Sequence, residues 1–104
     1  MTGTDALPEN VEVPGRTKGY MRGPGGWVLN TDTLPWRGTA AGGGYSTTRD
    51  LWRFAQALEG GKLLGAALRK EATVASKPGE RYGYGFQMSE KPARQYGHGG
   101  GAPG

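Results

Sequence analysis

One stretch of the chain, residues 47–59, combines a sustained helical pattern with a marked start and a marked end. Thr47 and Asp50 form a Thr-x-x-Asp pattern, a variant of the capping box that satisfies free N–H groups at a helix start. The apolar residues that follow recur at helical spacing and form one apolar face: Leu51, Phe54, Ala55 and Leu58. Gly60-Gly61 ends the pattern, because glycine adopts the left-handed conformation at low cost. The sequence predicts a helix over residues 47–59.

Glycine and proline interrupt the rest of the chain, which contains 21 Gly and 7 Pro among 104 residues. In the loop-rich segment 1–40, residues 17–22 and 27–30 are expected to form two short strands around the turn Gly23-Pro24-Gly25-Gly26. A second, shorter helix is expected over residues 65–73, within a helical segment that spans residues 41–75.

The C-terminal segment, residues 80–104, is expected to form a β-hairpin. Aromatic residues and glycines alternate from Tyr82 to Phe86, and this period of two predicts a strand over residues 82–88. A second strand is expected over residues 94–98, with a loop around Glu90-Lys91-Pro92 between the two. The elements together predict an α+β fold for a single, incomplete domain, because the chain ends on a run of glycines as if it were cut within a sheet.

Composition excludes several classes of function. The net charge is +4, but Lys and Arg are spread along the chain without a basic run, so no nucleic-acid partner is expected. The absence of cysteine excludes thiol catalysis and thiolate zinc sites, and a single histidine leaves little room for another metal site. We therefore expect no metal and no cofactor. No apolar run approaches membrane-spanning length, and nothing in the sequence indicates a location.

The sharpest local motif is His98-Gly99-Gly100-Gly101, which has two functional interpretations. The first is the oxyanion-hole motif of lipase-type α/β-hydrolases, where backbone N–H groups receive the charge of a tetrahedral intermediate. That interpretation needs a Gly-x-Ser-x-Gly sequence after the histidine. The nearest candidate, residues 44–48, lacks the final glycine and precedes the histidine, which disfavours this assignment.

The second interpretation comes from a resemblance that covers the chain from about residue 17 to its end. Residues 41–55, Ala-Gly-Gly-Gly-Tyr-Ser-Thr-Thr-Arg-Asp-Leu-Trp-Arg-Phe-Ala, resemble a segment of the serine β-lactamase and penicillin-binding-protein family, in its class C, D-aminopeptidase and esterase branch. Further matches follow in the family's order and spacing: Gly61-Lys62-Leu63-Leu64, residues 82–86 and residues 96–101. Upstream, Gly19-Tyr20 resembles the Gly-Tyr pair of such proteins.

The resemblance implies a partial β-lactamase-like fold and a parent that hydrolyses amides or esters through an acyl-serine intermediate. It places His98 in the cleft near the carboxylate or leaving group of a small-molecule or peptide substrate. Gly99 and Gly100 would leave room for the substrate, and the N–H of Gly101 would be an oxyanion-hole donor on the strand that borders the site. Whether the substrate is a β-lactam, a D-amino-acid peptide or an ester is left open.

The chain departs from the family at the nucleophile. No serine begins a Ser-x-x-Lys motif, since Ser46, Ser76 and Ser89 are followed three places later by Arg, Gly and Pro, and no tyrosine begins Tyr-x-Asn. Covalent acyl transfer then has no starting point. We expect the chain to be a C-terminal piece of such a hydrolase that is inactive alone and self-associates through an exposed sheet edge.

Other interpretations remain open at this point. The chain could be a small non-catalytic binding module that uses its glycine-rich tail and exposed aromatics. His98 could be an ordinary histidine at a strand end. Ser46 has the residue type of a helix-capping position, which explains it without a nucleophilic role.

Overall fold

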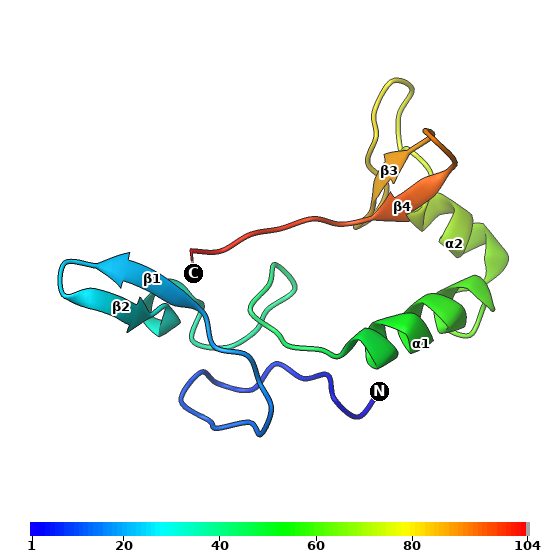
Figure 1. Ribbon diagram of the computed structural model, residues 1–104. Coiled ribbons are helices and arrows are strands. Elements are labelled where there is room, and N and C mark those ends of the chain that lie inside the picture. Colours follow the sequence, from blue (N-terminus) through cyan, green and yellow to red (C-terminus); the bar gives the residue numbers. More distant parts are fainter. Residues whose placement is uncertain (104) are drawn as a thin grey trace. The chain divides into compact units, whose positions relative to one another are not determined.

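The computed structural model describes residues 1–103, so Gly104, the last residue of the expected hairpin segment, lies outside the described residues. The chain divides into two compact units. Unit 1 comprises residues 1–51 together with the tail from Gly100, and unit 2 comprises residues 52–99. The elements in chain order are β1 (Tyr20–Gly23), β2 (Gly26–Leu29), the 3-10 turn η1 (Thr31–Thr33), α1 (Thr48–Glu59), α2 (Ala66–Ala72), β3 (Gln87–Ser89) and β4 (Gln95–Gly97) (Figure 1). Within residues 1–103, two helices and two separate antiparallel strand pairs confirm the predicted α+β class.

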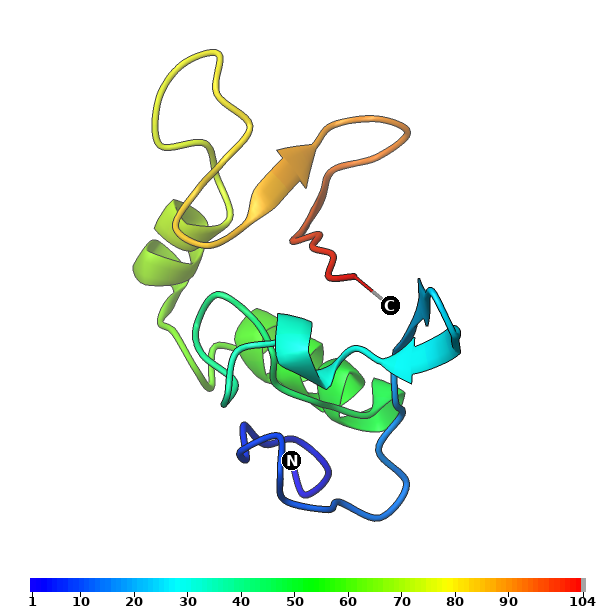
Figure 2. The ribbon, with the colours of Figure 1, turned by 90° about the vertical axis from the view of Figure 1, so that its left-hand side faces the viewer.

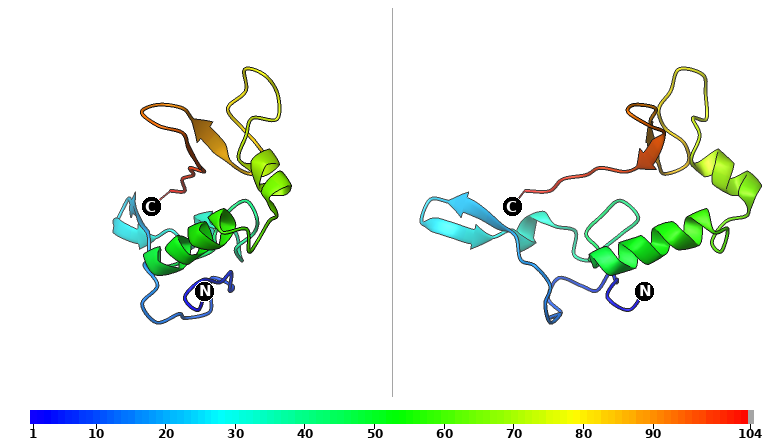
Figure 3. Two further views of the ribbon diagram at one scale, coloured as in Figure 1. Left: turned by 90° about the vertical axis from the view of Figure 1, so that its right-hand side faces the viewer. Right: turned by 45° about the vertical axis from the view of Figure 1, so that its right-hand side comes forward.

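In unit 1, β1 and β2 form an antiparallel hairpin around a tight turn (Figure 3). The register runs from Tyr20 opposite Leu29 to Gly23 opposite Gly26, which leaves Pro24 and Gly25 at the turn. Gly26 has a φ of +124°, a conformation that side chains disfavour, so the glycine here has a geometric cause. Both predicted strands are confirmed, although the first begins at Tyr20 rather than at Thr17.

The long predicted helix is confirmed as α1, and its start is capped as the sequence indicates. The N–H of Asp50 donates to Oγ1 of Thr47 over 3.1 Å. The Asp50 side chain is only 2% exposed, and its Oδ2 accepts hydrogen bonds from the N–H of Gly3 (2.7 Å) and the hydroxyl of Thr4 (3.0 Å). Asp50 therefore holds the first residues of the chain against the helix start.

Little apolar surface is buried in the described chain. Leu58, on the apolar face of α1, is 2% exposed, but Leu51 and Phe54 on the same face are 57% and 39% exposed. Among residues 1–103, the only buried hydrophobic residues are Leu58 and Ala72. Much of the apolar face of α1 thus lacks a covering layer. No helix in this described part is both long and apolar enough to span a membrane.

In unit 2, α2 confirms the predicted second helix, and a long loop separates it from β3 (Figure 2). The strand β3 pairs with β4 in antiparallel register, from Gln87 opposite Gly97 to Ser89 opposite Gln95. This pair confirms the C-terminal hairpin and its loop.

The predicted extent of the strand over residues 82–88 is wrong. Residues 83–86 form a tight turn, in which the N–H of Gly83 donates to the carbonyl of Phe86 over 2.8 Å and Gly85 adopts a φ of +87°. Tyr82 makes only an isolated bridge with Gln87. The glycines that suggested an open face of a strand are therefore turn residues, because the reversal needs a left-handed position. The second strand also ends one residue early, at Gly97, so His98 lies just beyond the ladder.

Candidate functional site

His98 follows directly after β4, and contacts hold its ring at both nitrogens. Nε2 lies 2.9 Å from the hydroxyl oxygen of Tyr82, and Nδ1 lies 2.5 Å from the carbonyl oxygen of Gly99. The two rings meet edge to face, with centroids 5.7 Å apart and planes at 89°. The imidazole is therefore exposed to solvent yet oriented by unit 2 itself.

The strand that leads to His98 is tied to both helices. The hydroxyl of Tyr96, on β4, donates to Oε1 of Glu59 at the end of α1. Arg94, just before β4, donates to the carbonyl of Thr73 after α2 over 3.2 Å. Tyr96 also packs edge to face against Phe86, with centroids 5.2 Å apart. These contacts fix the position at which the chain leaves the sheet and reaches the imidazole.

The contact between Tyr96 and Glu59 has an electrostatic consequence. Its hydrogen bond to Glu59 raises the pKa of Tyr96 above the ordinary value of 10.0, because the bond and the nearby carboxylate favour the neutral phenol. Partial burial adds to the rise, whereas the positive charges of Arg69 and Arg94 oppose it. The anchor of β4 therefore depends on a protonated tyrosine.

The glycines after His98 are not required by any neighbour in the described chain. A Cβ added at Gly100 or Gly101 would meet nothing within 4 Å, and one at Gly99 would lie 4.0 Å from Oε1 of Gln87. None of these residues has a left-handed φ. Within residues 1–103, no hydrogen bond uses the N–H of Gly101. The segment is thus extended backbone outside any strand, with open space where side chains would be.

The four residues expected to form the site, His98 to Gly101, are consecutive, so their proximity follows from the sequence alone. The structure corrects one expectation: they follow the strand rather than lie on it, since the ladder ends at Gly97. It also adds Tyr82, which the sequence placed in a strand and which no motif pairs with His98. Only the turn at residues 83–86 explains how Tyr82 comes to face the imidazole.

The tail after the glycines is held within unit 1 by Asn30. The side-chain amide of this buried residue donates to the carbonyl of Pro103 over 2.8 Å. The residue that packs on Asn30 is Gly19, where a Cβ would lie 2.4 Å from Nδ2 of Asn30. This close approach explains the glycine of the Gly19-Tyr20 pair, a residue that the resemblance singles out without a physical reason.

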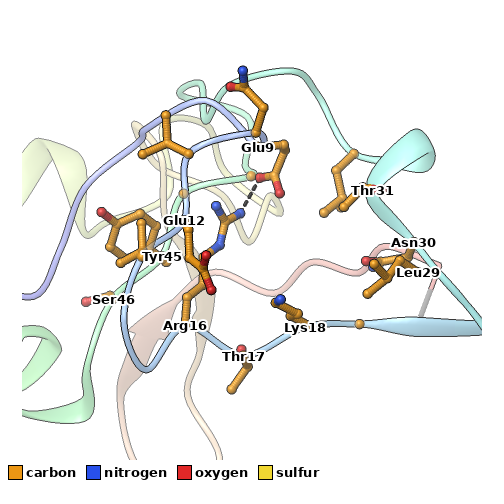
Figure 4. A pocket seen from close by; sticks show the side chains of 17 residues that line it. Glu9, Glu12, Arg16, Thr17, Lys18, Leu29, Asn30, Thr31, Tyr45 and Ser46 are labelled. Atoms are coloured by element: carbon orange, nitrogen blue, oxygen red, sulfur yellow. Dashed lines mark hydrogen bonds and ion pairs between the residues drawn. The ribbon is translucent and has the colours of Figure 1, made fainter.

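Unit 1 also contains a cavity of about 740 Å³, lined by residues between Glu9 and Ser46 (Figure 4). Arg16 forms an ion pair with Glu9 there, and its guanidinium lies over the ring of Tyr45 at 5.3 Å from the centroid. Both charged side chains are largely buried. The cavity is therefore lined by a neutralised ion pair, and sequence reasoning indicated neither Glu9 nor Arg16.

Ser46, which lines the same cavity, has no base beside it. Its Oγ shares a hydrogen bond of 2.7 Å with the hydroxyl of Thr4 and donates weakly to the carbonyl of Thr47 at 3.4 Å. No imidazole, amine or carboxylate bonds to this hydroxyl within residues 1–103, so the geometry does not make Ser46 a nucleophile. The same residues contain no cluster of His, Asp or Glu that could hold a metal ion.

Comparison with known proteins places these features in a family. The model of the beta-lactamase family matches residues 1–104. Among solved structures, a penicillin-binding protein from Bacillus halodurans superposes with a TM-score of 0.80 at 25% identity, and the match covers 97% of this chain and 33% of that one. No curated protein matches. The chain therefore spans about a third of the length of that penicillin-binding protein. This match confirms the resemblance to that family, and the chain belongs to the beta-lactamase family.

Proposed function

We propose that this chain supplies one wall of the active site of a β-lactamase-like serine hydrolase, which cleaves an amide or ester through an acyl-serine intermediate. The observation that carries the proposal is the segment from His98 to Gly101. It combines an oriented imidazole with three glycines that neither crowding nor backbone strain in the described chain requires. Such open, extended backbone is suited to a substrate that lies along it.

Each residue of the segment has a distinct role in this proposal. His98 faces the carboxylate or leaving group of a small-molecule or peptide substrate, and Gly99 and Gly100 leave room for the substrate's own backbone. The N–H of Gly101 donates to the developing oxyanion. Loss of one such donor typically costs about 2.7–4 kcal/mol of transition-state stabilisation. The substrate is a β-lactam, a D-amino-acid peptide or a simple ester.

The nucleophile must come from another stretch of polypeptide, because this chain has no Ser-x-x-Lys and no Tyr-x-Asn motif. The uncovered apolar face of α1, with Leu51 and Phe54 exposed, supports this division, since it offers a surface for the rest of such a domain. On this proposal the isolated chain is catalytically inactive. Its two-stranded sheets keep unpaired edges, through which it self-associates.

Complementation tests the proposal. The chain is incubated with a fluorescent penicillin or a fluorophosphonate probe, alone and mixed with a separately expressed segment that carries Ser-x-x-Lys and Tyr-x-Asn. We expect covalent labelling only in the mixture. Gly101→Pro removes the proposed donor and should abolish labelling, whereas the matched control Gly101→Ala keeps the N–H and should retain most of it. Labelling of the isolated chain would instead reveal a nucleophile within it, with Ser46 examined first.

A second candidate function is a non-catalytic binding module. The exposed aromatic side chains favour it, because Trp27 and Tyr84 are each 71% exposed and would serve as contact residues. Sedimentation analysis distinguishes the two candidate functions. A binding module should be a stable monomer, whereas part of a larger hydrolase should dimerise or aggregate. A monomer that shows no labelling in any mixture would favour the module.

A further inference from the structure

The two nitrogens of His98 have partners of different kinds, and this difference fixes where the proton lies. The carbonyl oxygen of Gly99 can only accept a hydrogen bond, so Nδ1, at 2.5 Å, must donate. In a neutral imidazole the other nitrogen is then an acceptor. The hydroxyl of Tyr82, 2.9 Å from Nε2, is able to donate to it. The contacts thus form a directed chain from Tyr82 through the imidazole to the Gly99 carbonyl.

We infer that Tyr82 is a positioning residue for His98. Its hydroxyl donates to the lone pair of Nε2 and so holds the neutral imidazole as the Nδ1–H tautomer. The inference concerns the imidazole itself, and its catalytic meaning rests on the proposed function. While the pair is intact, Nε2 is not a free general base. His98 then acts through a ring of fixed orientation rather than by taking a proton at that nitrogen.

Backbone contacts hold Tyr82 in place for this role. Its carbonyl accepts the N–H of Ser76 over 3.2 Å, and the carbonyl of the preceding Arg81 accepts the N–H of Met88 over 2.9 Å. These bonds fix the backbone on both sides of the tyrosine before its side chain meets His98. Because the two residues lie far apart in the sequence, the contact depends on the fold of the turn and not on chain adjacency.

Nuclear magnetic resonance of the full chain tests the inference directly, because His98 is the single histidine. Long-range ¹H–¹⁵N correlations are recorded at a pH above which the shifts of the ring nitrogens no longer change, so that the signals report the neutral imidazole. We expect a protonated-type signal for Nδ1 and an acceptor-type signal for Nε2. In Tyr82→Phe the ratio of the Nδ1–H to the Nε2–H tautomer should fall by about five-fold, the effect of one ordinary hydrogen bond.

Tyr84→Phe is the matched control, since Tyr84 lies two residues away, is 71% exposed and has no hydrogen bond from its hydroxyl within residues 1–103. Its tautomer ratio should equal that of the wild type. Nuclear Overhauser contacts between Phe86 and Tyr96 report whether the hairpin remains folded in each variant. An Nε2–H tautomer in the wild type, or an unchanged ratio in a folded Tyr82→Phe variant, would overturn the inference.

A further measurement covers the case in which Tyr82→Phe does not fold. In that case the wild type alone is measured. Nuclear Overhauser contacts are sought between the Tyr82 ring and the two carbon-bound imidazole protons that flank Nε2, and the tautomer of His98 is determined. Both are expected, and the absence of either refutes the inference. Because no step involves a substrate or probe, failure here leaves the complementation result intact, and failure of complementation leaves the tautomer result intact.

Discussion

The two hairpins of this chain share a topology but differ in what holds them. The ladder of β1 and β2 has four residue pairs and a tight turn, yet every residue of β2 is exposed and Trp27 is 71% exposed. The ladder of β3 and β4 has only three pairs, yet Tyr96 and Arg94 tie it to the ends of two helices. A ladder alone is marginal in water, so side-chain contacts outside the ladder decide how firmly each hairpin is held.

The difference also separates two kinds of surface. The first hairpin exposes its apolar side chains to solvent, which is typical of an element that packs against a further layer of structure. The second hairpin is already fixed within its own unit, and it positions the imidazole of His98. We therefore expect the second hairpin to be weakened by substitutions that remove its polar side-chain contacts. The first hairpin should be weakened by substitutions that disturb its base, where Asn30 is buried.

The largest effect is expected from Gly19→Ala, which attacks the base of the first hairpin. The new Cβ would lie 2.4 Å from Nδ2 of Asn30, so the buried amide or the backbone must shift. Overpacking of this kind costs about 1–3 kcal/mol. Urea unfolding and hydrogen exchange of the β1 and β2 amides measure it. Gly25→Ala is the control, because nothing lies within 4 Å of its Cβ position. Equal stability of the two variants would show that Asn30 is not the anchor.

A smaller effect is expected from Tyr96→Phe, which removes the tie between β4 and Glu59. One such hydrogen bond contributes about 1 kcal/mol. Hydrogen exchange should become faster at the β3 and β4 amides and stay unchanged at those of β1 and β2. Tyr20→Phe on β1 is the matched control, since its hydroxyl has no hydrogen bond within the described residues. Uniform loosening of both hairpins by Tyr96→Phe would contradict the comparison.

The same tie should give the second hairpin a dependence on alkaline pH that the first lacks. The pKa of Tyr96 is raised above 10.0, so the bond stabilises the fold fully below that value. This stabilisation is lost as the pH rises through the higher folded-state pKa. Carbon-13 spectra of labelled tyrosine should show Tyr96 titrating above the ordinary tyrosine pKa of 10.0. Glu59→Gln should lower the Tyr96 pKa, and identical titration of Tyr96 in both proteins would contradict the assigned cause.

The smallest effect is expected from Trp27→Ser on the first hairpin. A residue that is 71% exposed buries little surface in the fold, so its substitution removes few contacts. Substitutions at such positions usually change stability by less than about 0.5 kcal/mol. Thermal unfolding of the isolated chain measures it. A loss several times larger would mean that Trp27 already packs against a partner, such as a second copy of the chain.

Local patterns predicted the regular elements well. The cap at Thr47 and the apolar period from Leu51 to Leu58 identified α1, and the turn around Pro24 identified the first hairpin. The turn at residues 83–86 was missed because glycines that alternate with aromatics look the same in a strand and in a reversal. The partner of His98 could not be predicted, because Tyr82 reaches it only through that turn. The hydrogen bonds that Gly3 and Thr4 donate to Asp50 join residues far apart in sequence, which no local pattern specifies.

The open space around Gly99, Gly100 and Gly101 has a consequence for mutational scanning. Replacing an unstrained glycine by alanine commonly stabilises a fold by about 0.4–1 kcal/mol, through the unfolded chain. A library of this chain selected only for abundance should therefore accept many residues at these positions and even enrich some. The same library can also be selected for turnover in a complemented enzyme. If glycine is required only in that second selection, the requirement reports on catalysis and not on folding.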